Sequence, residues 1–301
     1  MESKQKLFID NDKCLRCGVC ASVCPARIFE KNEKGMVINK FREKYCITCG
    51  DCVSVCPKSA VKNTDVLTES INDIMPFIVP SQLVDFFKKR RSIRSYKDQV
   101  LSEYEKQFLT QIACLSPRGG HTHSIRNTEF VIVENKELLA QIVKYTYNYL
   151  YLLNKKLSSF WIKIPMAFNA SFRNSINNTC RMIEQTLAAK AENIDMLTYG
   201  APSLILLHSE KGSPVSRENL TIMEYQMMIG AETLDLGTCF LGWVSFALQS
   251  FQVKMTSELK AIYSKLGITK NREVLSAFAI GKKRGKYYNV KARSSMNYTI
   301  L

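Results

Sequence analysis

The sequence predicts an α+β protein of two domains, a small cysteine-rich domain followed by a larger one. The chain has 301 residues, which is more than one domain usually holds. One cysteine pattern occurs twice within the first sixty residues. In the remainder, helical periodicity dominates, and the few apolar strand-like runs are not regularly separated by single helices, which favours α+β over a doubly wound fold. We expect domains over residues 1–63 and 81–301, joined by a linker over 64–80.

The repeated pattern reads C-x2-C-x2-C-x3-C-P. In such a pattern the first three thiolates bind one iron–sulfur cubane and the fourth cysteine ligates the other cluster. Two copies therefore predict two [4Fe–4S] clusters and a domain that carries electrons. The ligands of the first cluster would be Cys14, Cys17, Cys20 and Cys56, and those of the second would be Cys46, Cys49, Cys52 and Cys24.

Zinc and disulfides explain these cysteines less well. Zinc sites use separated C-x2-C pairs, whereas each motif here has four closely spaced cysteines. We expect a cytoplasmic protein, because the polar start lacks the apolar core of a secretory signal and no apolar run is long enough to span a bilayer. Reducing conditions there disfavour disulfides. We expect the remaining cysteines, Cys114, Cys180 and Cys239, to be small buried apolar residues.

The net charge is strongly positive, with 42 Lys and Arg against 27 Asp and Glu, or +15. Such a charge could indicate nucleic-acid binding. No helix-turn-helix, zinc-finger or RNA-binding signature accompanies it, so we expect no nucleic acid and keep it as a minor alternative. We expect anion-binding sites and an acidic electron-donor partner.

The cysteine-rich domain should contain short strands at residues 6–10 and 36–39 and short helices at 19–24 and 53–56, which the following prolines end. Gly18 and Gly50 occupy equivalent positions in the two repeats, where the backbone must approach a cluster closely. Residues 64–80 show no periodicity and end between two prolines, as a linker would.

The larger domain should begin with a helix that has Ser81 as its N-cap. Further helices are expected at 104–115, from 136 to about 161, and at 180–192, 217–236 and 258–266. The methionines of the helix at 217–236 are expected in the core. The polar stretch 169–178 is expected to form a loop or lid. Buried strands are expected at 129–133, 203–207 and 274–280.

Two basic runs lie near opposite ends of the larger domain. Residues 90–96 read Arg-Arg-Ser-Ile-Arg-Ser-Tyr, and guanidinium groups beside a hydroxyl are typical of a phosphate site, although a solvated helix end would look the same. Lys291 and Arg293 would face the same way in an extended segment. The two runs form one site only if the fold brings them together.

Six segments resemble, in order, motifs of the nitroreductase family. They are residues 90–96, 116–121, 129–133, 200–207, 236–243 and 279–281, and the first resembles the family's opening FMN motif. Together with the cysteine motifs, they make the whole chain similar to the ferredoxin-domain nitroreductases of anaerobes. The resemblance implies a nitroreductase-like FMN-binding α+β domain behind a bacterial ferredoxin-like domain. It also implies a homodimer with FMN at the interface.

The resemblance further implies which residues bind FMN. Those near the phosphate and the ribityl chain would be Arg90, Arg91, Ser92 and Arg94, with Lys291 and Arg293 completing the phosphate site. Leu241 and Gly242 would lie by the flavin ring, with a backbone N–H reaching N5. The residues facing the pyrimidine side of the ring or the ribityl chain would be Pro117, Arg118, Gly119, Ser124 and Arg126.

Some positions depart from the family pattern. Arg126 replaces a glutamine and could favour the anionic reduced ring, or it could be surface charge. Lys282 and Lys283 replace a Tyr-Pro pair, so the path of the tail is not predicted. His121 and His123 could suggest a metal pair, but no further His or acidic partner stands at ligand spacing, so we expect them to line the substrate cavity.

These features predict an oxidoreductase that passes electrons from a low-potential donor, ferredoxin-like or NAD(P)H, through two [4Fe–4S] clusters to FMN. The acceptor would be a nitroaromatic, a quinone or a similar small molecule. No dedicated general acid or nucleophile is evident, and no G-x-G-x-x-G run supports direct use of NAD(P)H. The alternative is a non-catalytic electron-transfer or redox-sensing protein that carries the same cofactors.

Overall fold

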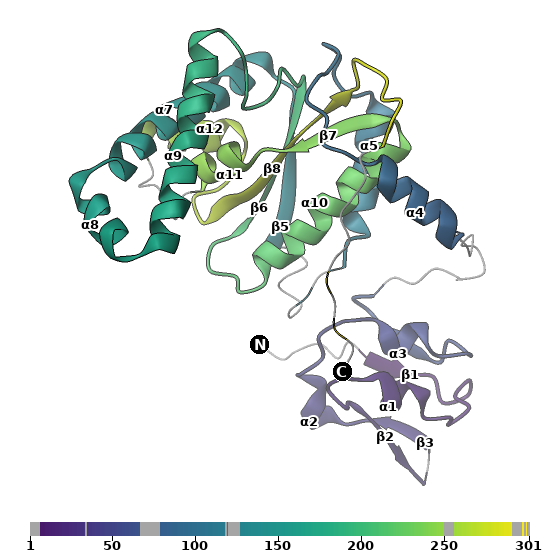
Figure 1. The fold of residues 1–301 in the computed structure, drawn as a ribbon. Coiled ribbons are helices and arrows are strands. Elements are labelled where there is room, and N and C mark those ends of the chain that lie inside the picture. Colours follow the sequence, from purple (N-terminus) through teal and green to yellow (C-terminus); the bar gives the residue numbers. More distant parts are fainter. Residues whose placement is uncertain are drawn as a thin grey trace. The chain divides into compact units, whose positions relative to one another are not determined.

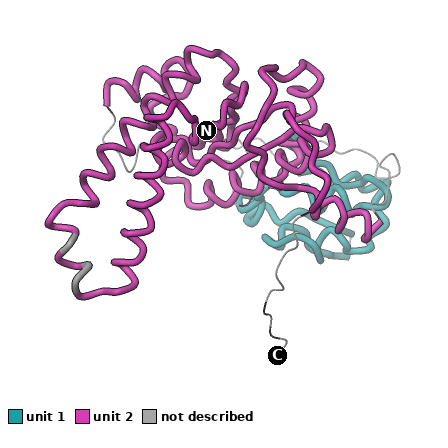
Figure 2. Tube along the Cα trace, turned by 45° about the horizontal axis from the view of Figure 1, so that its top comes forward, with its two compact units in different colours: residues 1–78, 120–125 teal, residues 79–119, 126–301 magenta. Residues whose placement is uncertain are grey.

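The computed structural model describes residues 7–33, 35–66, 79–117, 119, 127–249, 256–290, 297 and 299. These residues fall into two compact units, which Figure 2 colours separately. The first unit holds the described residues up to 66 and the second holds those from 79 onward. None of the helices in these ranges is both long and apolar enough to cross a membrane.

The first unit contains two small antiparallel sheets. Strand β1 (Leu7–Ile9) pairs with β4 (Val61–Asn63), and β2 (Phe29–Asn32) pairs with β3 (Gly35–Ile38). Its helices are α1 (Val19–Val23), α2 (Lys40–Glu43) and α3 (Asp51–Ser54). The sequence predicted β1 and β3 but missed β2 and β4, because neither has the length or alternation that marks a strand.

The duplication of the cysteine motif extends to the backbone. Gly18 and Gly50 cap α1 and α3 in the left-handed region, at φ values of 78° and 83°. Arg16 and Thr48, the residues before the second cysteine of each motif, both have φ of 56°. A positive φ is rare for residues other than glycine, so its recurrence at equivalent positions shows that both motifs wrap their chain in the same way.

The second unit is built on a four-stranded antiparallel sheet with the strand order β5-β6-β8-β7, at the centre of Figure 1. The strands are β5 (Thr128–Val133), β6 (Ser203–Glu210), β7 (Leu236–Phe240) and β8 (Arg272–Lys282). The helices are α4 (Pro80–Lys89), α5 (Glu103–Cys114), α7 (Lys136–Leu157), α8 (Phe160–Phe168), α9 (Ala170–Ala191), α10 (Ser216–Thr233), α11 (Gly242–Leu248) and α12 (Ser257–Lys265).

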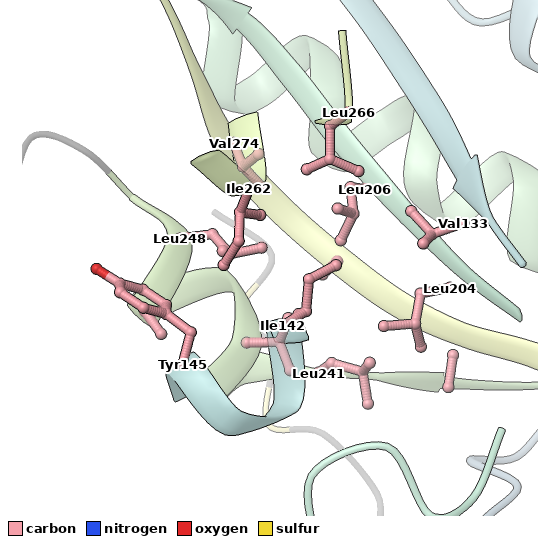
Figure 3. Packing of buried hydrophobic residues seen from close by; sticks show 14 of the residues in the cluster. Val133, Ile142, Tyr145, Leu204, Leu206, Leu241, Leu248, Ile262, Leu266 and Val274 are labelled. Atoms are coloured by element: carbon pink, nitrogen blue, oxygen red, sulfur yellow. The ribbon is translucent and has the colours of Figure 1, made fainter. Parts of the chain in front are cut away.

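Helices cover both faces of this sheet, so its central strands are apolar on both sides. Leu204 and Leu206 of β6 belong to a core cluster with α7, α11 and α12, part of which Figure 3 shows. Ile205 and Leu207 belong to a second cluster with α5 and α10. The predicted α+β fold is confirmed, and the methionines of α10 lie in the core as expected.

Several expected boundaries in the second unit were wrong. Residues 170–178, expected as a loop or lid, form the first half of α9, which the Asn169 side chain caps by accepting a hydrogen bond from the Phe172 N–H. The long helix expected from 136 breaks at Ser158 and Ser159. The helix expected to reach 236 ends at Thr233, because Asp235 adopts a left-handed φ of 54° and Leu236 begins β7.

Two smaller predictions also need correction. The N-cap of α4 is Val79 rather than Ser81, because Pro80 already occupies the first turn, where its missing N–H costs nothing. Of the three cysteines outside the motifs, Cys239 is buried as expected, but Cys114 is exposed and Cys180 is only partly buried.

A buried carboxyl group lies in the core between α10 and β8. Glu224 is only 1% exposed, and the Ser276 hydroxyl donates a hydrogen bond of 2.5 Å to its Oε2. Burial raises the pKa of Glu224 from 4.5 to about 7. The folded protein therefore holds this carboxyl protonated in a pH range where the unfolded chain releases the proton.

This shift predicts a pH-dependent loss of stability. Because the pKa is raised on folding, stability is fully present below about pH 4.5 and falls as the pH rises to about 7. Glu224→Gln should remove this slope and exceed the wild type by roughly 3 kcal/mol near pH 8, measured by chemical unfolding. Glu218→Gln, on the exposed face of the same helix, should leave the slope intact. An unchanged slope in Glu224→Gln would contradict the assignment.

Candidate functional site

Two cavities in the first unit are each lined by four cysteines. One is lined by Cys14, Cys17, Cys20 and Cys56. The other is lined by Cys24, Cys46, Cys49 and Cys52. Each cavity takes three cysteines from one motif and the fourth from the other motif, in the combination that the sequence pattern predicts for two cubane clusters.

Backbone N–H groups donate to the crossing cysteines. The Ile28 N–H lies 3.4 Å from the Cys24 Sγ, and the Ala60 N–H lies 3.2 Å from the Cys56 Sγ. The donors occupy equivalent positions in the two repeats. Such N–H donors to ligand sulfurs help to set the reduction potential of a bound cluster.

The cysteine side chains differ in how readily they lose a proton. Burial raises the pKa of the Cys52 thiol to about 11, and it also raises the pKa of Cys20. Burial also tends to raise the pKa of Cys56. Backbone N–H groups that donate to its sulfur, of which the Val61 N–H has the largest effect, outweigh burial and lower the pKa. Because cluster ligands are thiolates, iron must displace protons when it binds at Cys52 and Cys20.

The cysteines are spread around the walls of the two cavities. In the part of the chain that the structure describes, no three or more His, Cys, Asp or Glu side chains converge closely enough to hold one metal ion. The cavity walls between the cysteines are mainly apolar, with Ile9, Met36 and Val61 beside one and Leu7 and Ile28 beside the other. Apolar walls keep water from the sulfurs of a bound cluster.

The second unit has a basic cavity of about 660 Å³. Its walls combine residues 88–94 with residues 283 and 285–290, so the N-terminal basic run meets the C-terminal tail. Seven cationic and two acidic side chains line it. The cations are Lys88, Lys89, Arg90, Arg91, Arg94, Lys283 and Lys286, and the acids are Glu232 and Asp235. A cavity with this balance attracts anions such as a phosphate group.

Backbone pairing holds the two ends of the unit side by side. Ser92 forms a bridge with Thr238 of β7, and the Ile93 N–H donates to the Thr238 carbonyl at 2.9 Å. Further along, Tyr96 forms a bridge with Lys283, and the Lys97 N–H donates to the Lys282 carbonyl at 2.9 Å. The basic run thus extends the sheet beyond β7, which places its arginines at the cavity.

Not every cation in this cavity is available to a ligand. Lys283 lies 2.9 Å from both Glu232 and Asp235, and these carboxylates outweigh burial and raise its pKa. Its charge is therefore already balanced. Arg91 lies over the Tyr287 ring, 4.3 Å from its centroid, so its guanidinium plane has a defined position at the cavity wall.

The structure brings together four of the predicted FMN residues, Arg90, Arg91, Ser92 and Arg94, as the lining of this cavity. The other predicted phosphate residues, Lys291 and Arg293, lie outside the described residues. So do Arg118, Ser124 and Arg126 of the predicted pyrimidine loop, and His121 and His123.

Pro117 and Gly119 are the described residues of that predicted loop, and both are exposed. A buried side chain holds Gly119 in place through hydrogen bonds to its backbone. The Asn219 side chain of α10 accepts from the Gly119 N–H at 2.8 Å and donates to its carbonyl at 3.1 Å. The Asn219 side chain thereby satisfies both backbone hydrogen-bonding groups of Gly119. No local sequence pattern indicates this contact, because the two residues lie 100 positions apart.

Leu241 and Gly242 follow β7 directly. The Leu241 N–H donates to the Ala277 carbonyl at 2.9 Å, so it is already used within the sheet. Gly242 is the first residue of α11, and a first helical residue has no partner for its N–H inside the helix. Leu241 and Gly242 were both expected beside the flavin ring. The Gly242 N–H takes part in neither the sheet pairing nor the helix hydrogen bonds, so it is the better candidate of the two to donate to a ligand.

Sequence reasoning also missed Lys286 and Tyr287 at this site. They were visible only as part of a basic tail of unknown path, and they line the cavity. Cys239 of β7 is buried, which raises the pKa of its thiol, and it lies against Ser92 and Arg94.

Comparison with known proteins identifies the family. A sequence model described as the nitroreductase family matches residues 87–282. The chain belongs to the nitroreductase family. A second model, for a 4Fe–4S dicluster domain, matches residues 6–68 and covers both cysteine motifs. The resemblance noted from the sequence is therefore confirmed for both parts of the chain. No curated protein matches the sequence.

Solved structures show the same fold for this nitroreductase-family chain. A nitroreductase with bound FMN from Bacteroides fragilis is 17% identical, with a TM-score of 0.52, and the match covers 73% of this chain and 98% of that one. One with bound FMN from Desulfitobacterium hafniense is 16% identical, with a TM-score of 0.51 and coverages of 72% and 97%. A BluB-like flavoprotein from Clostridium difficile is 18% identical, with a TM-score of 0.50 and coverages of 71% and 94%.

The contact between the basic run and β7 should be sensitive to a single methyl group. A Cβ added at Gly237 would stand 2.7–2.9 Å from Ile93 side-chain atoms, and Ile93 is buried. Gly237→Ala should destabilise the second unit by about 1–3 kcal/mol and speed hydrogen exchange at the Ile93 amide.

Gly285→Ala is the matched control. It lies at the same cavity, and no heavy atom of the described chain stands within 4 Å of its added Cβ. It should unfold as the wild type does. Equal stability of the Gly237→Ala and Gly285→Ala proteins would contradict the packing described for Ile93.

Proposed function

We propose that this chain is an oxidoreductase that passes electrons from a low-potential donor through two [4Fe–4S] clusters to FMN. The terminal acceptor would be a nitroaromatic, a quinone or a similar small molecule. The observation that carries the proposal is the pair of four-cysteine cavities in a chain whose larger unit belongs to the nitroreductase family. One-electron clusters combined with a flavin that exchanges one or two electrons form a chemically consistent chain.

The basic cavity supports FMN as the flavin. Its excess of cations suits a phosphate monoester, and the Ser92 hydroxyl at its wall adds a hydrogen-bonding group. Structural relatives of this chain carry bound FMN. We assign the phosphate and ribityl chain to Arg90, Arg91, Ser92 and Arg94, with Lys291 and Arg293 completing the phosphate site. We assign Leu241 and Gly242 to the flavin ring, and Pro117, Arg118, Gly119, Ser124 and Arg126 to its pyrimidine side or to the ribityl chain.

The remaining features of the proposal follow the family. The protein would be a cytoplasmic homodimer with FMN at the interface, and its donor would be ferredoxin-like or NAD(P)H. We assign no catalytic residue. Protons for the acceptor would come from water or from tyrosines at the cavity, of which Tyr287 and Tyr288 are examples.

Anaerobic turnover of a nitroarene tests the proposal. The loaded protein is mixed with reduced ferredoxin or with NAD(P)H, and product is counted per flavin. Many turnovers with either donor support the enzyme. Product that stops at the stoichiometric amount would instead indicate an electron carrier or a redox sensor.

Crossed ligation of the clusters predicts a pattern of iron contents. The wild type purified under argon should hold about eight iron atoms per chain. A Cys14→Ala, Cys56→Ala double variant should keep about four, because both residues line one cavity. A Cys14→Ala, Cys24→Ala double variant should lose both clusters, because these residues line different cavities.

If each motif instead supplied all four ligands of one cluster, the result would be reversed. The Cys14→Ala, Cys24→Ala variant would then keep about four iron atoms, and the Cys14→Ala, Cys56→Ala variant would lose both clusters. Cys114→Ala serves as the control, since this cysteine is exposed and lies outside both motifs. It should retain the full iron content.

FMN retention should depend on Arg91. Loss of one guanidinium contact to phosphate costs about 1.5–3 kcal/mol, so Arg91→Ala should weaken FMN binding roughly tenfold to a hundredfold in a fluorescence titration. Arg181→Ala removes an equal charge from an exposed position on α9 and should bind FMN as the wild type does. Equal affinities in both variants would place the phosphate elsewhere.

A further inference from the structure

An exposed aromatic and cationic surface lies directly before Cys46. It consists of α2 and the residues that follow it, and its side chains are Lys40, Phe41, Arg42, Lys44 and Tyr45, which we call the α2 surface. Phe41 is 71% exposed and Tyr45 is 54% exposed. Two large aromatic side chains in water beside a cofactor ligand are unusual unless another surface covers them.

The α2 surface is held in a fixed arrangement. The Asn39 side chain caps α2 by accepting hydrogen bonds from the Phe41 and Arg42 N–H groups. The Lys44 ammonium lies over the Phe41 ring, 4.4 Å from its centroid, and 5.1 Å from the centroid of Tyr45. Arg42 donates to the Arg27 carbonyl at 3.3 Å. A surface organised in this way needs little reordering to bind a partner.

Glu43 is the acidic residue within residues 40–45, and it does not cancel the positive charge of the α2 surface. Glu43 is half-buried, and its Oε1 lies 3.5 Å from the Leu7 N–H of β1, toward the interior of the unit. Asp51 is a further acid of the same repeat, and it lies between Cys49 and Cys52 in the sequence. The exposed acid Glu30 also reaches this stretch, because its Oε1 accepts a hydrogen bond of 2.7 Å from the Asn39 side chain. Within residues 40–45 themselves, the exposed side chains are three cations and two aromatic rings.

The first repeat provides an internal comparison. The residues equivalent to Arg42 and Lys44 are Asp10 and Asp12, at the same distance before the first cysteine of the motif. Asp10 is paired with Lys13 at 3.2 Å. Both repeats wrap their cysteines with the same backbone conformation, so the cations and aromatics of the second repeat are not required for cluster binding. They are free to serve another purpose.

We propose that the α2 surface is the docking site of an acidic electron-carrier protein, such as a low-potential ferredoxin. Electrons would then enter at the cluster held by Cys24, Cys46, Cys49 and Cys52. This inference rests on the proposed function. In the entry step one electron leaves the reduced cluster of the carrier and reduces the cluster of this protein, and no covalent bond forms or breaks.

The charge distribution favours an acidic carrier over another copy of this chain as the partner that covers the α2 surface. Residues 79–301 carry 30 Lys and Arg against 17 Asp and Glu, so the net charge of a second copy of this chain opposes its binding to a cationic surface. Electron-transfer partners bind through small interfaces, and opposite charges speed their encounter. Exposed aromatic rings add short-range contact without a large buried area.

The test uses the loaded protein under argon and an acidic ferredoxin with two [4Fe–4S] clusters as the probe. Binding of the oxidised ferredoxin is measured by calorimetry, and cluster reduction by the reduced ferredoxin is followed in a stopped-flow instrument. Lys44→Glu should weaken binding and slow reduction by about tenfold at low salt, and the difference from wild type should shrink at high salt. Phe41→Ser should weaken binding without changing the salt dependence.

Asp12→Lys is the matched control, because Asp12 is exposed at the position equivalent to Lys44. It should bind the ferredoxin within about twofold of wild type if docking is local to the α2 surface. Wild-type binding by Lys44→Glu would overturn the proposal. Equal and opposite effects of Lys44→Glu and Asp12→Lys would also overturn it, because they would show a response to net charge alone.

Reduced methyl viologen separates this inference from the proposed function. This small cation needs no docking site, so it should reduce the clusters of all variants at similar rates. If it reduces the clusters but the flavin stays oxidised, the proposed relay fails, and the binding measurement still decides whether the α2 surface is the docking site.

Discussion

The structure of the first unit depends on the exchange of one cysteine between its two halves. Cys24 is the last cysteine of the first motif but lines the cavity of the second, and Cys56 of the second motif lines the cavity of the first. The unit has a small core, with Leu7, Ile28 and Phe29 among its buried residues. A module of this size buries too little apolar surface to be very stable by itself. Clusters bound across the two halves would therefore contribute to folding as well as to electron transfer.

A comparable constraint shapes the second unit, where the basic run and the tail come from opposite ends of the unit's own sequence. Backbone hydrogen bonds from Ile93 to Thr238 and from Lys97 to Lys282 hold them side by side. Gly237 permits the close approach of Ile93 to β7, because a Cβ at this position would stand 2.7–2.9 Å from Ile93 side-chain atoms. The same pairing that extends the sheet thus concentrates cations around one cavity, and Glu232 and Asp235 neutralise the lysine at its edge.

The sequence predicted what local patterns encode. The cysteine spacing specifies the ligands of each cavity, and the continuous apolar run of β6 indicates a strand buried on both faces. Features that depend on distant partners were missed. The polar start of α9 is helical because Asn169 caps it, and Asn219 reaches Gly119 only in the folded chain. Lys283 looked like one more cation of the tail, since its carboxylate partners lie about fifty residues earlier.

The order in which the cofactors are reduced tests the central claim most directly. The loaded protein is mixed anaerobically with a reduced low-potential ferredoxin, and the absorbance of the clusters and of the flavin is followed in the same experiment. The account predicts that the clusters bleach first, that the flavin follows, and that protein without clusters shows slow flavin reduction. Flavin reduction at the same rate with and without clusters would contradict the account.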